Sequence, residues 1–238
     1  AYIERAGALD LGGVAWADAR HQPLAPEVVY ALRHIQAVEH HVVALPRTVY
    51  TKRAVDDPMV STFFVAWLYG ELFHGRALKQ LLEAAGHDVM PDPCGYGSFA
   101  DAIDRRSVEW LSKVWPGFLA LYMTWGAIQE LTTLVSYQRL IKLGRQPVLV
   151  DVLGRIVRDE ALHFRFYFHQ AGERLAQRRT ARIARFLVDR FWNPVGSGVR
   201  PPAELARVIG FLYGGPEGRA AARRIDHTIR QLPGFDGV

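Results

Sequence analysis

The feature that most constrains this chain is a pair of Glu-x-x-His motifs, each set in a long apolar stretch. Glu71 and His74 form one motif in Gly-Glu-Leu-Phe-His-Gly, and Glu160 and His163 form the other in Arg-Asp-Glu-Ala-Leu-His. Side chains three residues apart lie on the same face of an α-helix. If both stretches are helical, each motif directs a carboxylate and an imidazole at one point.

Two further glutamates precede these motifs at similar distances. Glu39 lies 32 residues before Glu71, and Glu130 lies 30 residues before Glu160. Each sits within its own apolar run with helical spacing. The chain therefore repeats the order Glu, Glu-x-x-His, which predicts four helices that carry six polar side chains toward one place. His40 and His41 are neighbours of Glu39 that compete for its role.

Residues that typically begin and end helices occur where these four helices are expected to begin and end. Pro26, Pro58 and Pro147 each stand where proline suits the first turn of a helix, and Asp56-Asp57-Pro58 makes a turn and a new helix start. Gly86 is a plausible helix end. The expected helices begin at residues 26, 58, 118 and 147; the first is kinked or ended near Pro46, the second runs to about 85 and the third to 143.

The remaining segments are irregular or carry shorter helices. Loops are expected at residues 91–97, 116–117 and 193–198, where proline and glycine gather. Two short helices are expected around 203–212 and 217–231, and no strand-like alternation is present. The sequence predicts an all-α fold with one domain over residues 1–238, made of a metal-binding bundle at about 26–176 and a helical extension at about 177–238.

Four glutamates and two histidines on inward helix faces require a counter-charge. Buried carboxylates without partners are costly, and no matching set of lysines or arginines lies on the same helix stripes. Two divalent cations would balance four carboxylates while both imidazoles stay neutral. Mixed carboxylate and imidazole ligation suits iron or manganese, whereas structural zinc more often uses cysteine, of which the chain has one.

Composition and charge limit the classes of protein to which this chain can belong. No apolar run reaches the length of a membrane span, and the start of the sequence lacks the layout of a signal peptide. The single cysteine, Cys94, forms no internal disulfide, which favours a cytoplasmic location. The formal net charge of +5 favours acidic partners, although nothing resembles a nucleic-acid-binding motif. The arginines from Arg174 to Arg185 are interpreted as a solvated face, with a docking site as the alternative.

At these residues the chain resembles the soluble acyl-acyl-carrier-protein desaturases of plants and actinobacteria, within the ferritin-like di-iron carboxylate superfamily. The matching segments are Gly-Glu-Leu-Phe-His-Gly at 70–75, Gln-Glu-Leu-Thr-Thr at 129–133 and Arg-Asp-Glu-Ala-Leu-His at 158–163. The likeness covers about residues 30–175. It implies a ferritin-like four-helix bundle with a di-metal centre, extended by the C-terminal helices.

The resemblance also implies roles for individual residues. Two iron ions, with manganese as an alternative, would be held by six ligands: Glu39, Glu71, His74, Glu130, Glu160 and His163. Thr133 would lie over the centre and assist the activation of dioxygen. Asp159 would orient a ligand histidine through a hydrogen bond. The corresponding position before Glu71 is Gly70, where desaturases tend to carry an acid.

The implied reaction is oxidation of an unactivated C–H bond in an aliphatic acyl chain. The chain would arrive as a thioester on acyl carrier protein or a similar carrier, and a ferredoxin-type donor would supply electrons. A homodimer is expected, with no nucleic-acid partner. The wall of the substrate site is expected among the large apolar residues one turn from the ligands: Phe64, Trp67, Trp125, Ile128 and Phe164.

Other functions share this ligand set. One is an aldehyde-deformylating or N-oxygenating enzyme of the same superfamily, although Ile156 stands where some N-oxygenases add a third histidine. Another is a protein without turnover, either an iron store or an interaction module stabilised by metal. Product analysis separates the enzymes from one another, and assembly size separates a storage shell from a dimer.

Overall fold

The computed structural model describes residues 9–41, 52–89 and 99–236, and the regular secondary structure in these ranges is helical. A single isolated bridge joins Ser197 and Arg200. The elements are the 3-10 helix η1 (Trp16–Arg20) and the α-helices α1 (Pro26–His40), α3 (Lys52–Val55), α4 (Pro58–Ala84), α5 (Phe99–Val114), α6 (Phe118–Gly144), α7 (Pro147–Arg174), α8 (Arg178–Phe191), α9 (Pro202–Tyr213) and α10 (Gly215–Ile229). The all-α prediction is confirmed for these residues.

The helix starts follow from local chemistry. Proline occupies the first position of α1, α4 and α7, where its missing N–H costs no hydrogen bond. The Asp57 side chain accepts hydrogen bonds from the backbone N–H groups of Met59, at 3.1 Å, and Val60, at 3.2 Å, so it caps α4 at the predicted helix start. Gly86 follows the end of α4 with φ +82°, a conformation that suits glycine.

Most predicted segments have a counterpart in the structure. The break at residues 116–117 separates α5 from α6, and the two short C-terminal helices are α9 and α10. The arginine-rich stretch after Arg174 forms α8. The expected kink at Pro46 and the expected loop at 91–97 lie outside the described residues. None of the described helices combines the length and apolarity that crossing a bilayer requires.

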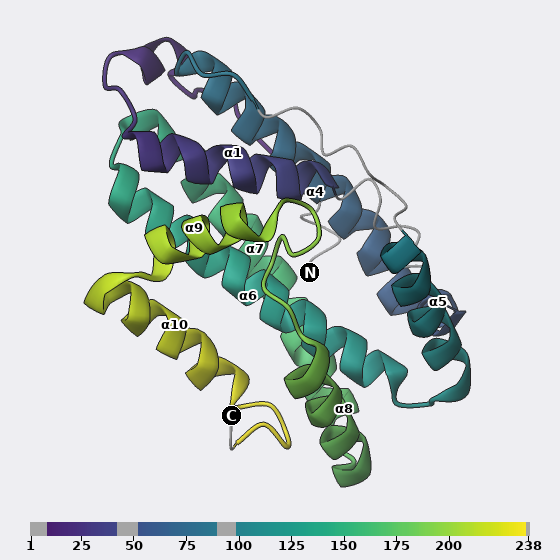
Figure 1. Cartoon of the computed structure of the whole chain (residues 1–238). Coiled ribbons are helices and arrows are strands. Elements are labelled where there is room, and N and C mark those ends of the chain that lie inside the picture. The colour runs from purple at the N-terminus through teal and green to yellow at the C-terminus, as the bar shows by residue number, and fades with distance from the viewer. Residues whose placement is uncertain (1–8, 42–51, 90–98, 237–238) are drawn as a thin grey trace.

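Four long helices form the centre of the molecule (Figure 1). Helix α1 packs along α4, and α6 packs along α7 over most of its length. Two residues, Arg145 and Gln146, join α6 to α7, so these helices run antiparallel. Helix α8 packs against α6, while α9 and α10 contact each other and cover α1 and α6.

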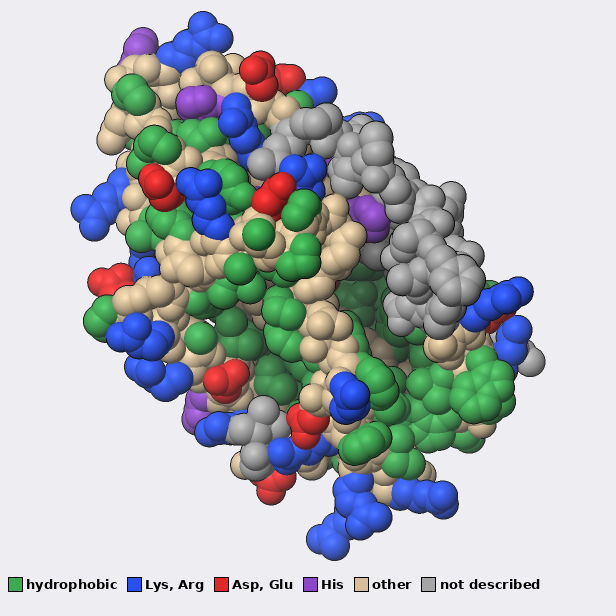
Figure 2. Space-filling view, viewed as in Figure 1, with side chains coloured by type: hydrophobic (Ala, Val, Ile, Leu, Met, Phe, Trp, Pro, Cys, Tyr) green, Lys and Arg blue, Asp and Glu red, His purple; other side chains and the backbone are tan. Residues whose placement is uncertain are grey.

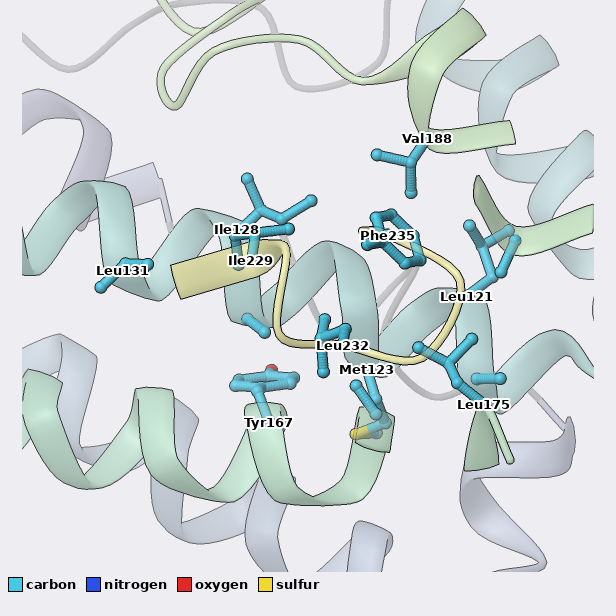
Figure 3. Packing of buried hydrophobic residues seen from close by; sticks show 14 of the residues in the cluster. Leu121, Met123, Ile128, Leu131, Tyr167, Leu175, Val188, Ile229, Leu232 and Phe235 are labelled. Carbon is cyan, nitrogen blue, oxygen red and sulfur yellow. The ribbon is translucent and has the colours of Figure 1, made fainter. Parts of the chain in front are cut away.

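The buried apolar residues form two clusters. The first contains residues of α4, α6 and α7 near Phe63, Met123 and Tyr167, and the C-terminal Leu232 and Phe235 pack into it (Figure 3). The second contains other parts of the same helices and of α1. Along α4 the first cluster ends at Trp67 and the second begins at Ala77. The Glu-x-x-His motif of α4 lies between them.

Candidate metal centre

The six residues that the sequence singles out come from four helices and are all buried. Their exposed fractions are 6% for Glu39 on α1, 6% for Glu71 and 0% for His74 on α4, 6% for Glu130 on α6, and 1% for Glu160 and 2% for His163 on α7. They occupy the polar layer between the two apolar clusters. Of the three candidates Glu39, His40 and His41, it is Glu39 that joins the other five.

The ligand atoms fall into two overlapping groups of four. One group is Glu39, Glu71, His74 and Glu160, and the other is Glu71, Glu130, Glu160 and His163; within each group the atoms lie within 4.8 Å of one another. Glu71 and Glu160 belong to both groups. Each group offers enough ligand atoms to hold one cation, so the arrangement could hold two, with Glu71 and Glu160 available to both.

Both imidazoles direct Nδ1 inward. His74 Nδ1 lies 3.4 Å from Glu71 Oε2 and 3.2 Å from Glu160 Oε1. His163 Nδ1 lies 2.9 Å from Glu71 Oε1 and 3.5 Å from both Glu130 Oε2 and Glu160 Oε2. Each histidine thus contacts both shared glutamates, so α4 and α7 meet at one centre, and Glu130 adds α6 to it.

The Nε2 atoms of His74 and His163, which point away from the centre, have different neighbours. His74 Nε2 lies 3.4 Å from Asp159 Oδ2, so a proton on Nε2 would leave the Nδ1 lone pair free to face inward. The structure therefore places Asp159 beside a candidate ligand, on the motif of the other helix. A Cβ atom at Gly70 would lie 3.7 Å from His163 Nε2. The missing acid at position 70 thus makes the centre asymmetric.

Tyr137 contacts the centre directly, although no sequence motif marks it. Its hydroxyl donates a 2.6 Å hydrogen bond to Glu39 Oε1, and its side chain is fully buried. Burial and the nearby Glu39 carboxylate raise the pKa of Tyr137 well above its ordinary value, so it stays a neutral donor. Its place on α6, two turns after Glu130 and on an apolar face, is the weak sequence signal that existed.

The pKa directions describe the charge balance of the cluster without metal. Burial alone would raise the pKa of Glu71, but His74 and His163 outweigh it and hold that pKa well below its ordinary value; the pKa of Glu160 is lowered in the same way. Burial followed by neighbouring carboxylates raises the pKa of Glu39, and burial is also the main cause of the raised pKa of Glu130. These directions favour the ionised form of Glu71 and Glu160 and the protonated form of Glu39 and Glu130.

Burial alone would lower the pKa of both histidines, yet the carboxylates around them raise it well above the ordinary value. For His74 the main opposing cause is the charge of Glu71, and for His163 it is the close approach of the Glu130 carboxylate to Nδ1. Four protons added to the four carboxylates and two neutral imidazoles, at Glu39, Glu130, His74 and His163, would make the cluster neutral. Two divalent cations would supply the same four positive charges in their place.

Several buried polar atoms that face the centre are better placed to bind a metal than to form hydrogen bonds. Glu71 Oε1, His74 Nδ1 and both carboxylate oxygens of Glu160 are buried and make no hydrogen bond of acceptable geometry among the described residues. Groups without such a bond are costly inside a protein. No lysine or arginine of the described ranges forms an ion pair with the four glutamates. The donor set, four carboxylates and two imidazoles, therefore fits a pair of divalent cations.

A cavity of about 500 Å³ adjoins the cluster at Glu39. It is lined mainly by apolar side chains of α1, α6, α8, α9 and α10, among them Ile35, Val38, Ile128, Val188, Val208 and Ile229. Figure 2 shows a hollow with hydrophobic walls on this face of the molecule. Thr133 and Tyr137 also line it. The structure therefore places Thr133 in the wall of the same cavity that Glu39 lines.

The lining of this cavity differs from the wall that the sequence predicts for a substrate site. Of the five residues proposed from sequence, Ile128 lines this cavity, while Phe64, Trp67, Trp125 and Phe164 pack in or against the first apolar cluster. The aromatic rings of α4 meet Tyr167, which lies 5.9 Å from the Trp67 ring centre. The wall comes largely from the C-terminal helices instead, which approach the centre from the α1 and α6 side.

No family model, no curated protein and no solved structure matches this chain. Its function is therefore inferred from the geometry of the centre and of the cavity.

Proposed function

We propose that the protein is a ferritin-like di-iron oxidase that uses dioxygen to oxidise an aliphatic chain, with desaturation of an acyl group on acyl carrier protein as the nearest known reaction. One observation carries the proposal: two four-ligand groups share Glu71 and Glu160, and one of their outer ligands, Glu39, also lines a cavity of about 500 Å³. The cavity volume lies within the range of small-molecule sites, and its walls are apolar.

Each part of the site has a task in this proposal. Glu39, Glu71, His74, Glu130, Glu160 and His163 would hold two iron ions, which supply the electrons for dioxygen activation when bound. Asp159 holds the outer nitrogen of His74, and Tyr137 fixes the Glu39 carboxylate. The cavity positions an aliphatic substrate beside Glu39 and excludes water from it. A ferredoxin-type donor would restore the electrons.

The first test is metal content. We expect about two iron ions per chain after loading with ferrous iron, because two ligand groups are present. Glu130→Ala or His163→Ala should abolish this loading, since each removes a ligand from a buried site. Glu83→Ala is the matched control, because Glu83 lies on α4 with a side chain 55% exposed. Two irons retained in either ligand variant would contradict the assignment. Competition with manganese identifies the preferred metal.

The second test concerns Thr133. Thr133→Val removes a hydroxyl from the cavity wall at nearly constant volume, and we expect product formation to slow by roughly 10²-fold with metal content unchanged, if that hydroxyl assists proton movement. Thr132→Val is the matched control: Thr132 lines the same cavity, but its hydroxyl bonds to the Ile128 carbonyl at 2.7 Å. Equal rates in the two variants would remove the support for desaturase-like chemistry.

The reaction itself is decided by products. Acyl thioester, long-chain aldehyde and arylamine are offered in turn to the iron-loaded protein with dioxygen and a reductant. An unsaturated acyl product supports the proposal, whereas a shortened alkane or an oxidised amine assigns one of the alternative oxygenase reactions. If iron binds but none of the three is converted, and the particle in solution is a many-subunit shell, storage replaces oxidation as the function.

A further inference from the structure

Helix α8 presents a face that the oxidase chemistry does not use. Arg178, Arg182, Phe186 and Arg190 follow one another at four-residue intervals and are all exposed. The Phe186 side chain is 64% exposed, and Phe191 at the end of the helix is 54% exposed. The opposite face, with Ala181, Ala184 and Val188, is buried against the first apolar cluster. The helix is therefore strongly amphipathic, and aromatic rings interrupt its charged face.

The positions of the arginines in α8 do not serve to stabilise the helix. Helix α8 contains five arginines and one aspartate, and its first turn has no acidic residue. Arg178, Arg179 and Arg182 make no ion pair with any residue in the described ranges. Positive charge at a helix N-terminus opposes the helix dipole and destabilises the helix. Their position thus indicates an external partner with negative charge.

A second exposed apolar group lies at the same end of the molecule. Trp110 and Val114 of α5 are 64% and 51% exposed. A Cβ atom at Gly117, just before α6, would lie 3.0 Å from Thr180 Cγ2 in the first turn of α8. The end of α5 and the start of α8 therefore adjoin the same turn. In Figure 2 the basic side chains project at the lower tip of this view, beside a large hydrophobic area.

From this surface we propose that α8 and the end of α5 dock the protein onto an anionic lipid bilayer. Arginines supply attraction to lipid headgroups, and exposed phenylalanine and tryptophan enter the interface between headgroups and acyl chains. Because the apolar face of α8 is buried in the protein, its exposed face would contact the bilayer through the arginines and the rings of Phe186 and Phe191. This binding is separate from the oxidase function and requires no metal, so the two proposals can fail independently.

Two other partners, a second copy of the chain and an acidic protein, fit the surface formed by α8 and the end of α5 less well. A second copy of the chain would bring two arginine-rich helices together, and like charges repel. An acidic protein would match the charge, but protein interfaces concentrate their apolar residues in a central patch. Here the rings of Phe186 and Phe191 alternate with arginines along one helix, and Arg190 stacks on Phe191 at 5.4 Å from its ring centre.

Docking through α8 would also place the cavity close to lipid. Val188 and Asp189 of the same helix line the cavity that reaches Glu39. An apolar substrate dissolved in the bilayer would then have a short path to the candidate centre. This consequence rests on the proposed function, whereas the docking itself does not.

The test is co-sedimentation of the full chain with vesicles of phosphatidylcholine alone and of phosphatidylcholine mixed with phosphatidylserine. We expect binding to the mixed vesicles, weakened by salt because it is electrostatic. The triple variant Arg178→Gln, Arg179→Gln, Arg182→Gln should lower the partition coefficient by roughly fivefold for each arginine, or on the order of a hundredfold. Phe186→Ser should weaken binding without changing its salt dependence.

A matched control uses the same charge change on another helix. Arg219, Arg223 and Arg224 of α10 are exposed, and their replacement by glutamine should leave binding within roughly fivefold of the parent. Circular dichroism confirms that each variant is folded. The proposal is overturned if the parent chain does not bind mixed vesicles, if the α10 variant loses binding as strongly as the α8 variant, or if an acidic carrier protein binds α8 while vesicles do not.

Discussion

Tyr137 connects the candidate centre to the cavity, because its ring lines the cavity and its hydroxyl donates to Glu39 at 2.6 Å. A carboxylate with one oxygen held in this way has a fixed orientation toward a metal. Groups that orient ligands in this manner typically contribute a roughly 10- to 100-fold effect on metal affinity. Tyr137 is therefore a positioning residue, since it acts through Glu39.

The corresponding prediction is that Tyr137→Phe weakens one of two bound metals. We expect the affinity of the position formed by Glu39 and His74 to fall by roughly tenfold or more, while the position formed by Glu130 and His163 changes little. Titration with ferrous or manganous ions, followed by calorimetry, would show two unequal steps. Tyr213→Phe is the control, because its hydroxyl lines the same cavity but bonds to Ser136 and the Thr132 carbonyl. Equal effects in both variants would contradict a positioning role.

The ligands could be predicted from sequence because their spacing is local. Glu71 and His74, like Glu160 and His163, share a face of one helix whatever the tertiary structure. Tyr137 could not, because its partner Glu39 lies 98 residues earlier and the contact depends on how α1 packs on α6. Thr133, expected over the centre, lines the cavity that Glu39 also lines, and its place over a bound metal stays a prediction.

At the scale of helices, the approach of α1 to α4 sets the position of Glu39. A Cβ atom at Gly75 would lie 3.4 Å from Glu39 Cβ and 3.4 Å from the backbone nitrogen of His40. A glycine at this point lets the two helices come close together where the ligands meet. A larger side chain would push α1 outward and move Glu39 away from Glu71 and His74.

This predicts a graded response to substitution at position 75. Gly75→Ala adds an ordinary contact and removes a flexible residue from a helix interior, so we expect stability to stay the same or rise by up to about 1 kcal/mol. Gly75→Val should cost about 1–3 kcal/mol through overpacking and should reduce metal loading below two ions per chain. Thermal unfolding and metal analysis measure both effects. Full loading in the valine variant would show that Glu39 does not depend on this contact.

The elements themselves were largely predictable, because proline, aspartate and glycine mark the helix ends in the sequence and in the structure alike. The wall of the cavity could not be predicted in this way. The aromatic residues near the motifs were expected to form it, yet most of them pack among themselves, and the wall comes from α8, α9 and α10. The placement of these C-terminal helices follows from long-range contacts that no short sequence pattern records.

At the scale of the whole molecule, stability and metal binding are linked through the protons of the cluster. Without metal, the raised pKa values of Glu39, Glu130, His74 and His163 mean that the folded chain holds protons that the unfolded chain releases. A group with a raised folded pKa contributes stability below its unfolded pKa, and this contribution is lost as pH rises through the folded pKa. The ordinary pKa values are 4.5 for glutamate and 6.5 for histidine.

The metal-free protein should therefore lose stability as pH rises from about 5 to 8. Glu71 and Glu160 act in the opposite sense, because their lowered pKa values cost stability when pH falls below about 4.5. With two divalent cations in place of the four protons, the loss between pH 5 and 8 should disappear. Melting temperatures measured with and without metal should accordingly diverge as pH increases.

The same linkage predicts proton release on metal binding. Because two divalent cations replace the protons on two glutamates and two histidines, uptake of two ions by one chain should release up to about four protons near neutral pH. A pH-stat titration in weak buffer measures this number directly, and His163→Ala, which removes one protonated ligand and one metal position, should lower it. Metal uptake without proton release, or a metal-free stability that increases between pH 6 and 8, would contradict the charge balance from which the di-metal centre is inferred.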